Sequence, residues 1–374
     1  MMKSSRSTRL RLAATAAMGG MLVGSAAAAA PAAGPPATAC PTAPLPTGPG
    51  APGPGGGVPP IPMAKTVAPG DTSTSIVIHP DATRQISCGR TPLKTHNDVV
   101  FGHAKAPNGA DLPLAMDILV PDTPGKKPLV VYVPGGGFVI APKDGGLDLR
   151  SYVAEAGFVV ASISYRTVLN RAIYRDGVAD VKSAIRFLRA HADEYGIDGG
   201  HVAVWGESAG GYLVAMVGVT NGDHSFDVGD NLTQSSAVQA VVDKFGASDV
   251  SKVALDFDVD TQHIYGGPGP LAMYVGGFRP GGGLVDPASD PIAHIAASDP
   301  PFLIFHGNAD HIVSPSQTLA LHNALRAAGV KSARYVLDGA NHGDLAFLGD
   351  PKAGLAWSSR QTMDIIVDFL RKTL

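Results

Sequence analysis

The sequence predicts an α/β protein whose largely parallel sheet is covered by helices on both faces. From about residue 128 onward, short apolar runs typical of buried strands alternate with stretches in which apolar residues recur every three or four positions, as in helices. The chain from residue 71 to residue 374 is long enough for one large domain of this class. We see no internal repeat in it.

The predicted elements follow one another in a simple order. The first two strands, at 98–104 and 112–121, are joined through APNGADLP and predict an antiparallel hairpin at one edge of the sheet. Later strands are predicted at 128–134, 158–166, 201–206, 240–246, 301–307 and 333–339, and helices at 177–195, 314–329 and 358–374. Between residues 252 and 295 the pattern dissolves into Gly, Pro and short apolar pieces. We interpret this segment as an insertion over the carboxyl ends of the strands, where α/β sheets place their ligand crevice.

The first thirty residues resemble an export signal. Basic residues at 3, 6, 9 and 11 precede an apolar stretch at about 12–23, and small residues follow in GSAAAAA. The apolar stretch is short for a membrane anchor. We therefore expect residues 1–30 to be a secretion signal cleaved near residue 30. The protein would then be secreted, extracellular or periplasmic, without stable insertion in a membrane.

Residues 31–65 are rich in proline and glycine and lack a pattern that would form a core. We interpret them as a disordered linker before a catalytic domain at 66–374, and we expect deletion of residues 1 to about 65 to leave activity largely unchanged. The chain has two cysteines, Cys40 and Cys88. In an exported protein such a pair forms a disulfide or remains as two unpaired thiols, and the sequence leaves both alternatives open.

Composition excludes several classes of function. The chain is 45% hydrophobic and 16% charged, and its formal net charge of −3 offers no electrostatic footprint for nucleic acid. Two cysteines without a cluster of further ligands argue against a zinc site, so we expect no metal. Nothing in the sequence indicates the oligomeric state.

The clearest motif lies at the seam between a predicted strand and a predicted helix. The stretch HVAVWGESAGGYLVAMV places Ser208 between Gly206 and Gly210, in the pattern G-x-S-x-G. A strand that turns directly into a helix leaves the central residue at the apex of a sharp bend. Glycines fit there because the neighbouring backbone comes close. The arrangement exposes a serine hydroxyl beside helix N–H groups, which predicts a nucleophile.

A serine hydroxyl needs a base to take its proton, and the base is usually a histidine oriented by a carboxylate. In this architecture the carboxylate and the histidine follow the serine in that order. Asp310 and His342 each lie in a loop directly after one of the last two predicted strands, so we assign them as carboxylate and base. Asp344 is too close in sequence to reach back to the His342 ring. Asp249 follows an earlier strand, where a turn or a helix cap is the better interpretation.

Two further features surround this predicted site. His306 and His311 flank Asp310, and we expect them to orient its loop. Three glycines, at 135–137, follow the early buried strand in LVVYVPGGGF. Backbone N–H groups in such a loop can point at a developing negative oxygen. With the N–H of Ala209 at the start of the helix, Gly136 and Gly137 are the predicted oxyanion donors.

These residues together resemble the α/β-hydrolase carboxylesterases of the hormone-sensitive-lipase type and related secreted acetyl or feruloyl esterases. The resemblance covers residues 128–374 and rests on GGGF, SYR, VWGESAGG, DPPFLIFHGNADHIV and GANHGD in family order. It implies an α/β-hydrolase fold with a mostly parallel eight-stranded sheet, a Ser-Asp-His triad, no cofactor and hydrolysis of carboxylic esters. The family usually has a histidine before the three glycines. Here Pro134 stands in its place, so we expect the loop to be braced differently.

Three hypotheses of function remain. The first is a secreted esterase that acts on small or medium acyl esters, either free or linked to a polysaccharide. The second is a serine peptidase of the prolyl-oligopeptidase type, which shares the motif and the triad order but usually carries a large additional domain. The third is a non-catalytic binding protein on a hydrolase fold, which would normally show a gap in the triad. No motif in 140–148 or 252–295, the expected walls of the site, indicates the acyl or alcohol group.

Overall fold

The structure is a computed structural model that describes residues 38–42, 62–276, 286–343 and 352–374. The predicted secretion signal and most of the predicted linker lie outside these residues. In the described parts of the chain, no helix is both long and apolar enough to cross a membrane.

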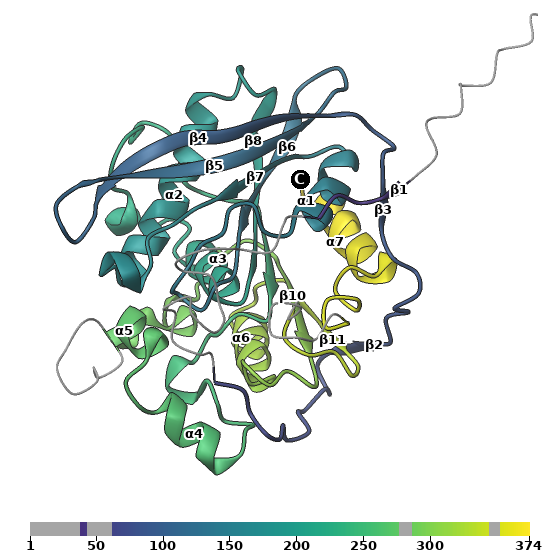
Figure 1. Ribbon diagram of the computed structural model, residues 1–374, viewed down its shortest axis with the longest axis vertical. Coiled ribbons are helices and arrows are strands. Elements are labelled where there is room, and N and C mark those ends of the chain that lie inside the picture. Colours follow the sequence, from purple (N-terminus) through teal and green to yellow (C-terminus); the bar gives the residue numbers. More distant parts are fainter. Residues whose placement is uncertain (1–37, 43–61, 277–285, 344–351) are drawn as a thin grey trace, which may run out of the picture. The chain divides into compact units, whose positions relative to one another are not determined.

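The main sheet has nine strands in the described residues, in the order β2-β11-β10-β9-β8-β6-β7-β5-β4. All neighbours from β2 to β7 pair in parallel, and β5 and β4 are antiparallel at one edge (Figure 1). The strands are β2 (Ile76–Ile78), β4 (Leu93–Lys105), β5 (Asp111–Pro121), β6 (Lys127–Val133), β7 (Val159–Ile163), β8 (Ile197–Glu207), β9 (Ala240–Lys244), β10 (Phe302–Gly307) and β11 (Ser332–Leu337). The predicted α/β-hydrolase fold and its edge hairpin are confirmed.

The sheet has one strand more than the eight that we expected. The additional strand, β2, has three residues and pairs in parallel with β11 at the far edge. It places Ile76 opposite Tyr335 and Ile78 opposite Leu337. A strand this short carries no periodicity that sequence analysis can recognise, because alternation needs at least four residues to be seen.

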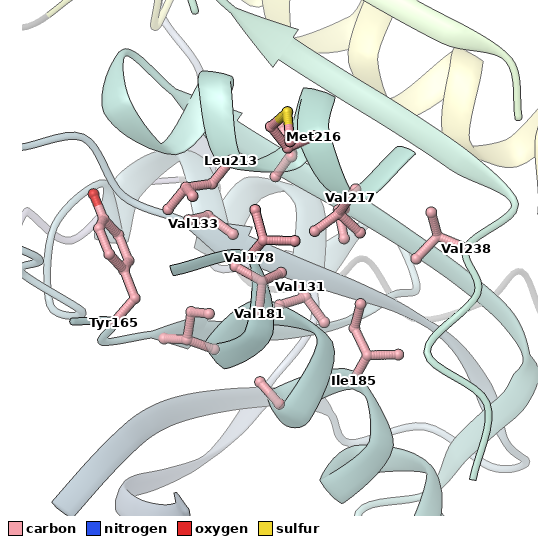
Figure 2. Packing of buried hydrophobic residues seen from close by; sticks show 14 of the residues in the cluster. Val131, Val133, Tyr165, Val178, Val181, Ile185, Leu213, Met216, Val217 and Val238 are labelled. Carbon is pink, nitrogen blue, oxygen red and sulfur yellow. The ribbon is translucent and has the colours of Figure 1, made fainter. Parts of the chain in front are cut away.

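Helices cover both faces of the sheet. On one face, α2 (Tyr174–Ala190), α3 (Ala209–Val219) and α6 (Ser316–Ala327) pack on the strands. Figure 2 shows this core, in which Val131 and Val133 of β6 meet Val178 and Val181 of α2 and Leu213 of α3. On the other face, α1 (Leu147–Glu155) and α7 (Arg360–Thr373) lie side by side (Figure 1). Burial on both faces explains why the central strands are continuously apolar rather than alternating.

Shorter elements lie outside the sheet. The 252–295 segment contains α4 (Val259–Tyr265) and α5 (Pro270–Gly276), followed by two short 3₁₀ turns at Pro287–Ser289 and Pro291–His294. At the start of the described chain, β1 (Thr38–Ala39) pairs antiparallel with β3 (Ser87–Cys88), and a disulfide joins Cys40 to Cys88. Of the two alternatives that the sequence left open for the cysteines, the structure has the disulfide.

Candidate active site

Ser208 lies at the bend between β8 and α3, with φ at 54° and ψ at −118°. This positive φ is rare for a residue with a side chain and marks local backbone strain. The glycines on either side are required by close approaches of backbone. A Cβ on Gly206 would lie 2.2 Å from the carbonyl oxygen of Gly210, and one on Gly210 would lie 1.9 Å from that of Val133. The bend therefore presents the Ser208 hydroxyl at the carboxyl end of the sheet.

Three residues that we predicted from the sequence lie together at this edge. The Nε2 atom of His342 is 2.8 Å from Ser208 Oγ, and its Nδ1 atom is 2.7 Å from Asp310 Oδ2. A carboxylate only accepts hydrogen bonds, so Nδ1 carries the hydrogen and Nε2 presents its lone pair to the serine hydroxyl. In this tautomer His342 is ready to accept a proton from Ser208.

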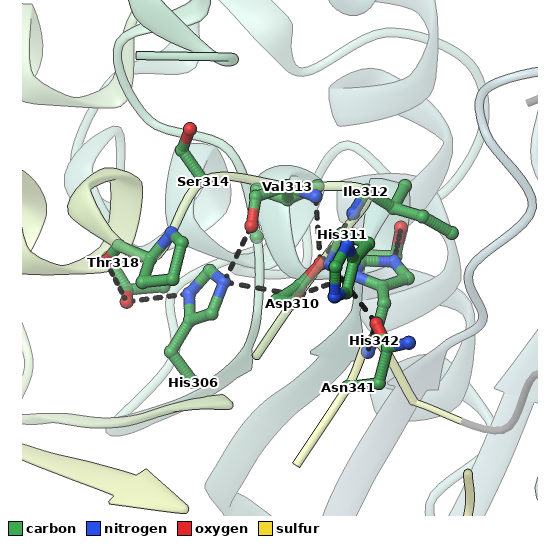
Figure 3. Close-up of polar contacts among 12 residues, drawn as sticks. His306, Asp310, His311, Ile312, Val313, Ser314, Thr318, Asn341 and His342 are labelled. Atoms are coloured by element: carbon green, nitrogen blue, oxygen red, sulfur yellow. Dashed lines mark hydrogen bonds and ion pairs between the residues drawn. The ribbon is translucent and has the colours of Figure 1, made fainter. Parts of the chain in front are cut away.

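Asp310 is fully buried in the loop after β10. Its Oδ1 accepts the backbone N–H groups of Ile312 and Val313 at 2.8 and 2.9 Å, and its Oδ2 faces His342 and His306 at 2.7 and 3.1 Å (Figure 3). Burial alone would raise the pKa of this carboxyl. The neighbouring His342 and His306 rings outweigh burial and hold the pKa well below its usual range. The carboxylate therefore stays ionised.

The loops of Asp310 and His342 are tied to each other by Asn341. Its Oδ1 accepts the backbone N–H of His311 at 3.1 Å and that of His342 at 2.7 Å. The His342 ring also packs on Phe245, with ring centroids 4.6 Å apart. These contacts fix the position of the imidazole relative to the carboxylate.

The predicted oxyanion loop follows β6 and passes directly beside the serine. A Cβ on Gly135 would lie 3.1 Å from the carbonyl oxygen of Glu207 and 3.2 Å from Ser208 Cβ, closer than ordinary van der Waals contact. Gly136, with φ at 145°, accepts at its carbonyl the N–H groups of Val139 and Ile140. The N–H groups of Gly136, Gly137 and Ala209 donate to no oxygen within the part of the chain that the structure describes. Three free donors thus lie in the glycine loop beside Ser208 and at the start of α3.

The oxyanion loop is braced by aromatic residues rather than by a histidine. The Tyr165 hydroxyl donates to the carbonyl of Pro134 at 2.9 Å. Phe138 stacks on Tyr274 of α5 at 4.5 Å between ring centroids, and its carbonyl accepts the N–H of Val168 at 2.9 Å. Proline thus retains the acceptor that Tyr165 uses. Tyr165 was not among the residues predicted to belong to the site, although it belongs to the SYR segment.

The loop after β10 that carries Asp310, which we call the acid loop, contacts residues from distant parts of the chain. In α4, the Tyr265 hydroxyl donates to the carbonyl of Ile312 at 2.6 Å. Ala64 donates its N–H to the carbonyl of His311 at 2.8 Å, and its own carbonyl accepts from His311 Nδ1 at 2.7 Å. Ala64 is buried in a small apolar cluster with Ile312 and Val313. Residues near 64, which we interpreted as linker, therefore pack against the site.

The rival carboxylates lie elsewhere or outside the described residues. Asp249 bonds to Ser251 and Lys252 in its own turn, both at 2.6 Å, as expected for a turn residue. Asp344 lies outside the described residues. Within the described ranges, no three His, Cys, Asp or Glu side chains are grouped so that they could hold a metal ion.

Comparisons with known proteins agree with this architecture. The BD-FAE family model matches residues 116–325, more than half of the chain, and the model of the prolyl oligopeptidase family matches residues 287–372. The chain is similar to two proteins of Mycobacterium tuberculosis. It is 30% identical to the probable carboxylic ester hydrolase LipM over 61% of this chain and 51% of that protein, and 29% identical to the esterase LipQ over 73% and 61%.

Solved structures are similar as well. A thermophilic esterase of Thermogutta terrifontis, Est2, matches with a TM-score of 0.56 and 28% identity, over 75% of this chain and 92% of that one. A carbohydrate esterase from gut microbiota matches with a TM-score of 0.58 at 24% identity, over 79% and 99%, which shows the shared fold. The matches span only 51% and 61% of the length of the two curated relatives. The chain belongs to the BD-FAE family and is an α/β-hydrolase of the carboxylesterase type.

Proposed function

We propose that this chain is a secreted serine carboxylesterase that hydrolyses small to medium acyl esters through an acyl-enzyme intermediate. The observation that carries the proposal is the continuous hydrogen-bonded line from Ser208 Oγ through His342 to Asp310, with distances of 2.8 and 2.7 Å. Such a line at the carboxyl edge of an α/β sheet is the arrangement that activates a serine for acyl transfer.

In the proposed reaction, Ser208 Oγ attacks the ester carbonyl carbon as its proton passes to His342 Nε2. Asp310 stabilises the resulting imidazolium through Nδ1. The N–H groups of Gly136, Gly137 and Ala209 hold the negative oxygen of the tetrahedral intermediate. Collapse breaks the bond to the alcohol oxygen, which takes the proton from His342. Water then repeats the sequence on the acyl-serine and releases the carboxylic acid.

The experiment that tests this function is a hydrolysis panel of p-nitrophenyl esters from two to twelve acyl carbons, with acetylated xylan and feruloyl esters beside it. The wild-type chain should hydrolyse at least one ester, and Ser208→Ala should lower kcat by several orders of magnitude. Near wild-type turnover by Ser208→Ala would refute the mechanism. The panel also determines the acyl length, which we expect to be set by walls built from α4, α5 and the loop at 140–148.

A peptidase activity is the second candidate, because the prolyl oligopeptidase model matches residues 287–372. That stretch includes both Asp310 and His342 but not the nucleophile. Peptidyl p-nitroanilides with proline or alanine before the scissile bond separate the two functions. We expect hydrolysis of esters and no turnover of the anilides.

Secretion is supported by the Cys40–Cys88 disulfide, since such bonds persist in oxidising compartments. Expression of the full chain in a bacterial host should place the protein in the periplasm or the medium. Sequencing of its amino terminus should then find a new end near residue 30. A cytoplasmic protein with an intact first residue would contradict this part of the proposal.

A further inference from the structure

A second histidine contacts the carboxylate of Asp310. His306, the penultimate residue of β10, is fully buried. Its Nε2 atom lies 3.1 Å from Asp310 Oδ2 and 3.0 Å from the carbonyl oxygen of Val313 (Figure 3). Both oxygens can only accept, so Nε2 must carry a hydrogen that the two share.

The other nitrogen of this ring faces a hydroxyl. Thr318 Oγ1, in α6, lies 2.8 Å from His306 Nδ1. The same oxygen accepts the Nε–H of Arg334 at 3.0 Å, and an arginine can only donate. The other acceptor near the Thr318 hydroxyl is the carbonyl of Pro315, at 3.5 Å, and this carbonyl already accepts from Arg334 Nη2 at 2.8 Å. The Thr318 hydroxyl therefore donates its hydrogen bond to Nδ1, which accepts with its lone pair, and the His306 ring is neutral.

The two histidines would otherwise compete for one negative charge. If His306 took up a proton, its positive charge would neutralise Asp310, and His342 would lose the partner that stabilises its own protonated form. Burial lowers the pKa of His306, Asp310 acts in the opposite direction, and the charge of Arg334 lowers it further. Burial raises the pKa of the Tyr265 phenol, and the charge of Asp310 raises it further, so this phenol stays un-ionised.

Burial and three nearby carboxyl groups affect the pKa of Arg334. Burial lowers its pKa to about 10, although Asp256, Asp71 and Asp243 raise it. Arg334 therefore remains protonated at neutral pH. Its bond to Thr318 keeps the same direction throughout the range in which an esterase would be assayed.

We infer that His306 is a positioning residue of the proposed esterase site: Arg334 and Thr318 hold it neutral, and it donates Nε2–H to Asp310 while His342 alone changes charge. The inference rests on the proposed function. The hydrogen bond from His306 partly neutralises the charge on Oδ2. Asp310 therefore stabilises the His342 imidazolium less than it would without His306. The donor also keeps the carboxylate aligned with the His342 ring. His306 therefore influences both the pH profile and the maximal rate without touching the substrate.

The first test compares His306→Gln, which retains an N–H donor near the position of Nε2, with His306→Leu, which has none. In His306→Leu we expect the midpoint of the acid limb of kcat/KM to move to higher pH by about half a unit and the plateau to fall about tenfold. His306→Gln should stay within about twofold of wild type. If the midpoint of His306→Leu coincides with that of wild type, or if His306→Gln behaves like His306→Leu, the inference is wrong.

The second test needs no substrate and also covers a leucine variant that fails to fold. In ¹⁵N-histidine-labelled wild-type protein, the signals lost in His306→Gln should belong to a ring with Nε2 protonated and Nδ1 unprotonated at pH 7. Thr318→Val should change the Nδ1 signal, whereas Thr318→Ser, which keeps the hydroxyl, should not. The inference is wrong if the ring is doubly protonated, or if the Nδ1 signal is the same in Thr318→Val as in wild type. If no ester is hydrolysed, the proposed function fails and this measurement alone decides the role of His306.

Discussion

The backbone carbonyl of Lys244 accepts the backbone N–H of Ser208 at 2.9 Å. The side chain of Lys244 also reaches this bend, where its ammonium pairs with the Glu207 carboxylate at 2.5 Å. This ammonium is fully buried, 5.2 Å from the centre of the Trp357 ring. The last residue of β9 thus holds both Glu207 and Ser208 in place.

This pair predicts a stability effect. Lys244→Met should lower the free energy of unfolding by about 3 kcal/mol, because it leaves the Glu207 carboxylate without its partner. Chemical denaturation measures the change. The matched control is Lys126→Met, which breaks the exposed ion pair with Asp193 and should change the free energy of unfolding far less than Lys244→Met. Equal effects of the two substitutions would contradict a structural role for Lys244.

The carboxylate assignment predicts a contrast between two aspartates. Asp310→Asn should lower kcat/KM about a thousandfold or more, because an amide neither stabilises the imidazolium nor selects the right tautomer of His342. Asp249→Asn should change kcat/KM little, since the side chain of Asp249 bonds to Ser251 and Lys252 in its own turn. Steady-state kinetics on one p-nitrophenyl ester compares them. The reverse ranking would move the carboxylate to Asp249.

The pH profile of the wild-type chain follows from the same residues. The Asp310 carboxyl has a pKa well below its usual range, so it stays ionised at every pH of a normal assay. A single acid limb should therefore remain, set by the base that takes the serine proton. We expect kcat/KM to rise through neutrality and to level off at about pH 8, as for an imidazole base. A second acid limb would show that another group must ionise.

Asp243 predicts a pH-dependent stability. It is fully buried, and a Cβ on Gly211 in the first turn of α3 would lie 2.5 Å from its Oδ1. Burial raises its pKa to about 7, so the folded chain keeps a proton that the unfolded chain releases near pH 4. Its contribution to stability is complete below about pH 4 and is lost as the pH rises to about 7, by up to about 4 kcal/mol.

The variant Asp243→Asn isolates this contribution. The amide oxygen can still accept the N–H of Gly246, which Oδ1 accepts at 2.9 Å, but the side chain no longer titrates. The difference in unfolding free energy between the variant and wild type should therefore rise in favour of the variant from pH 4 to pH 8. A difference that is constant with pH would mean that Asp243 is ionised in the folded chain throughout.

The contacts of Ala64 predict how many amino-terminal residues can be removed before activity and Tm fall. Removal of residues 1–61 should leave most of the activity, whereas removal of 1–66 should lower it and reduce the Tm by several degrees, because the two bonds between Ala64 and His311 are lost. Both truncations lack Cys40, so the disulfide does not distinguish them. Equal activity and Tm would restore our sequence-based boundary at residue 65.

The parts of the candidate site that follow strand ends could be predicted from the sequence. Ser208, Asp310 and His342 each come directly after an apolar strand, and parallel strands bring such positions to one edge of the sheet. No comparable sequence pattern predicts contacts between segments that lie far apart in the chain. The bonds of Ala64 to His311 and of Arg334 to Thr318 join residues 247 and 16 positions apart, and nothing local in either segment indicates its partner.

The roles of His306 and His311, which flank Asp310, could also be predicted only in part. Their closeness to Asp310 in sequence predicted that they orient its loop, but not how. His306 contacts the carboxylate from the strand, while His311 points away from it to the backbone of Ala64. The direction of a side chain in a loop depends on the loop backbone, which a pattern of residue types does not specify.

The disulfide between Cys40 and Cys88 encloses a stretch of chain with a sequence separation of 48 residues. Hydrolysis of any single peptide bond between the two cysteines would therefore yield two polypeptides that remain covalently joined. A sample hydrolysed at one such bond would have the mass of the intact chain plus one water and would run as one band until a thiol reductant is added. Ala64, which bonds to His311, lies within this ring, so a clipped molecule would keep this segment covalently attached.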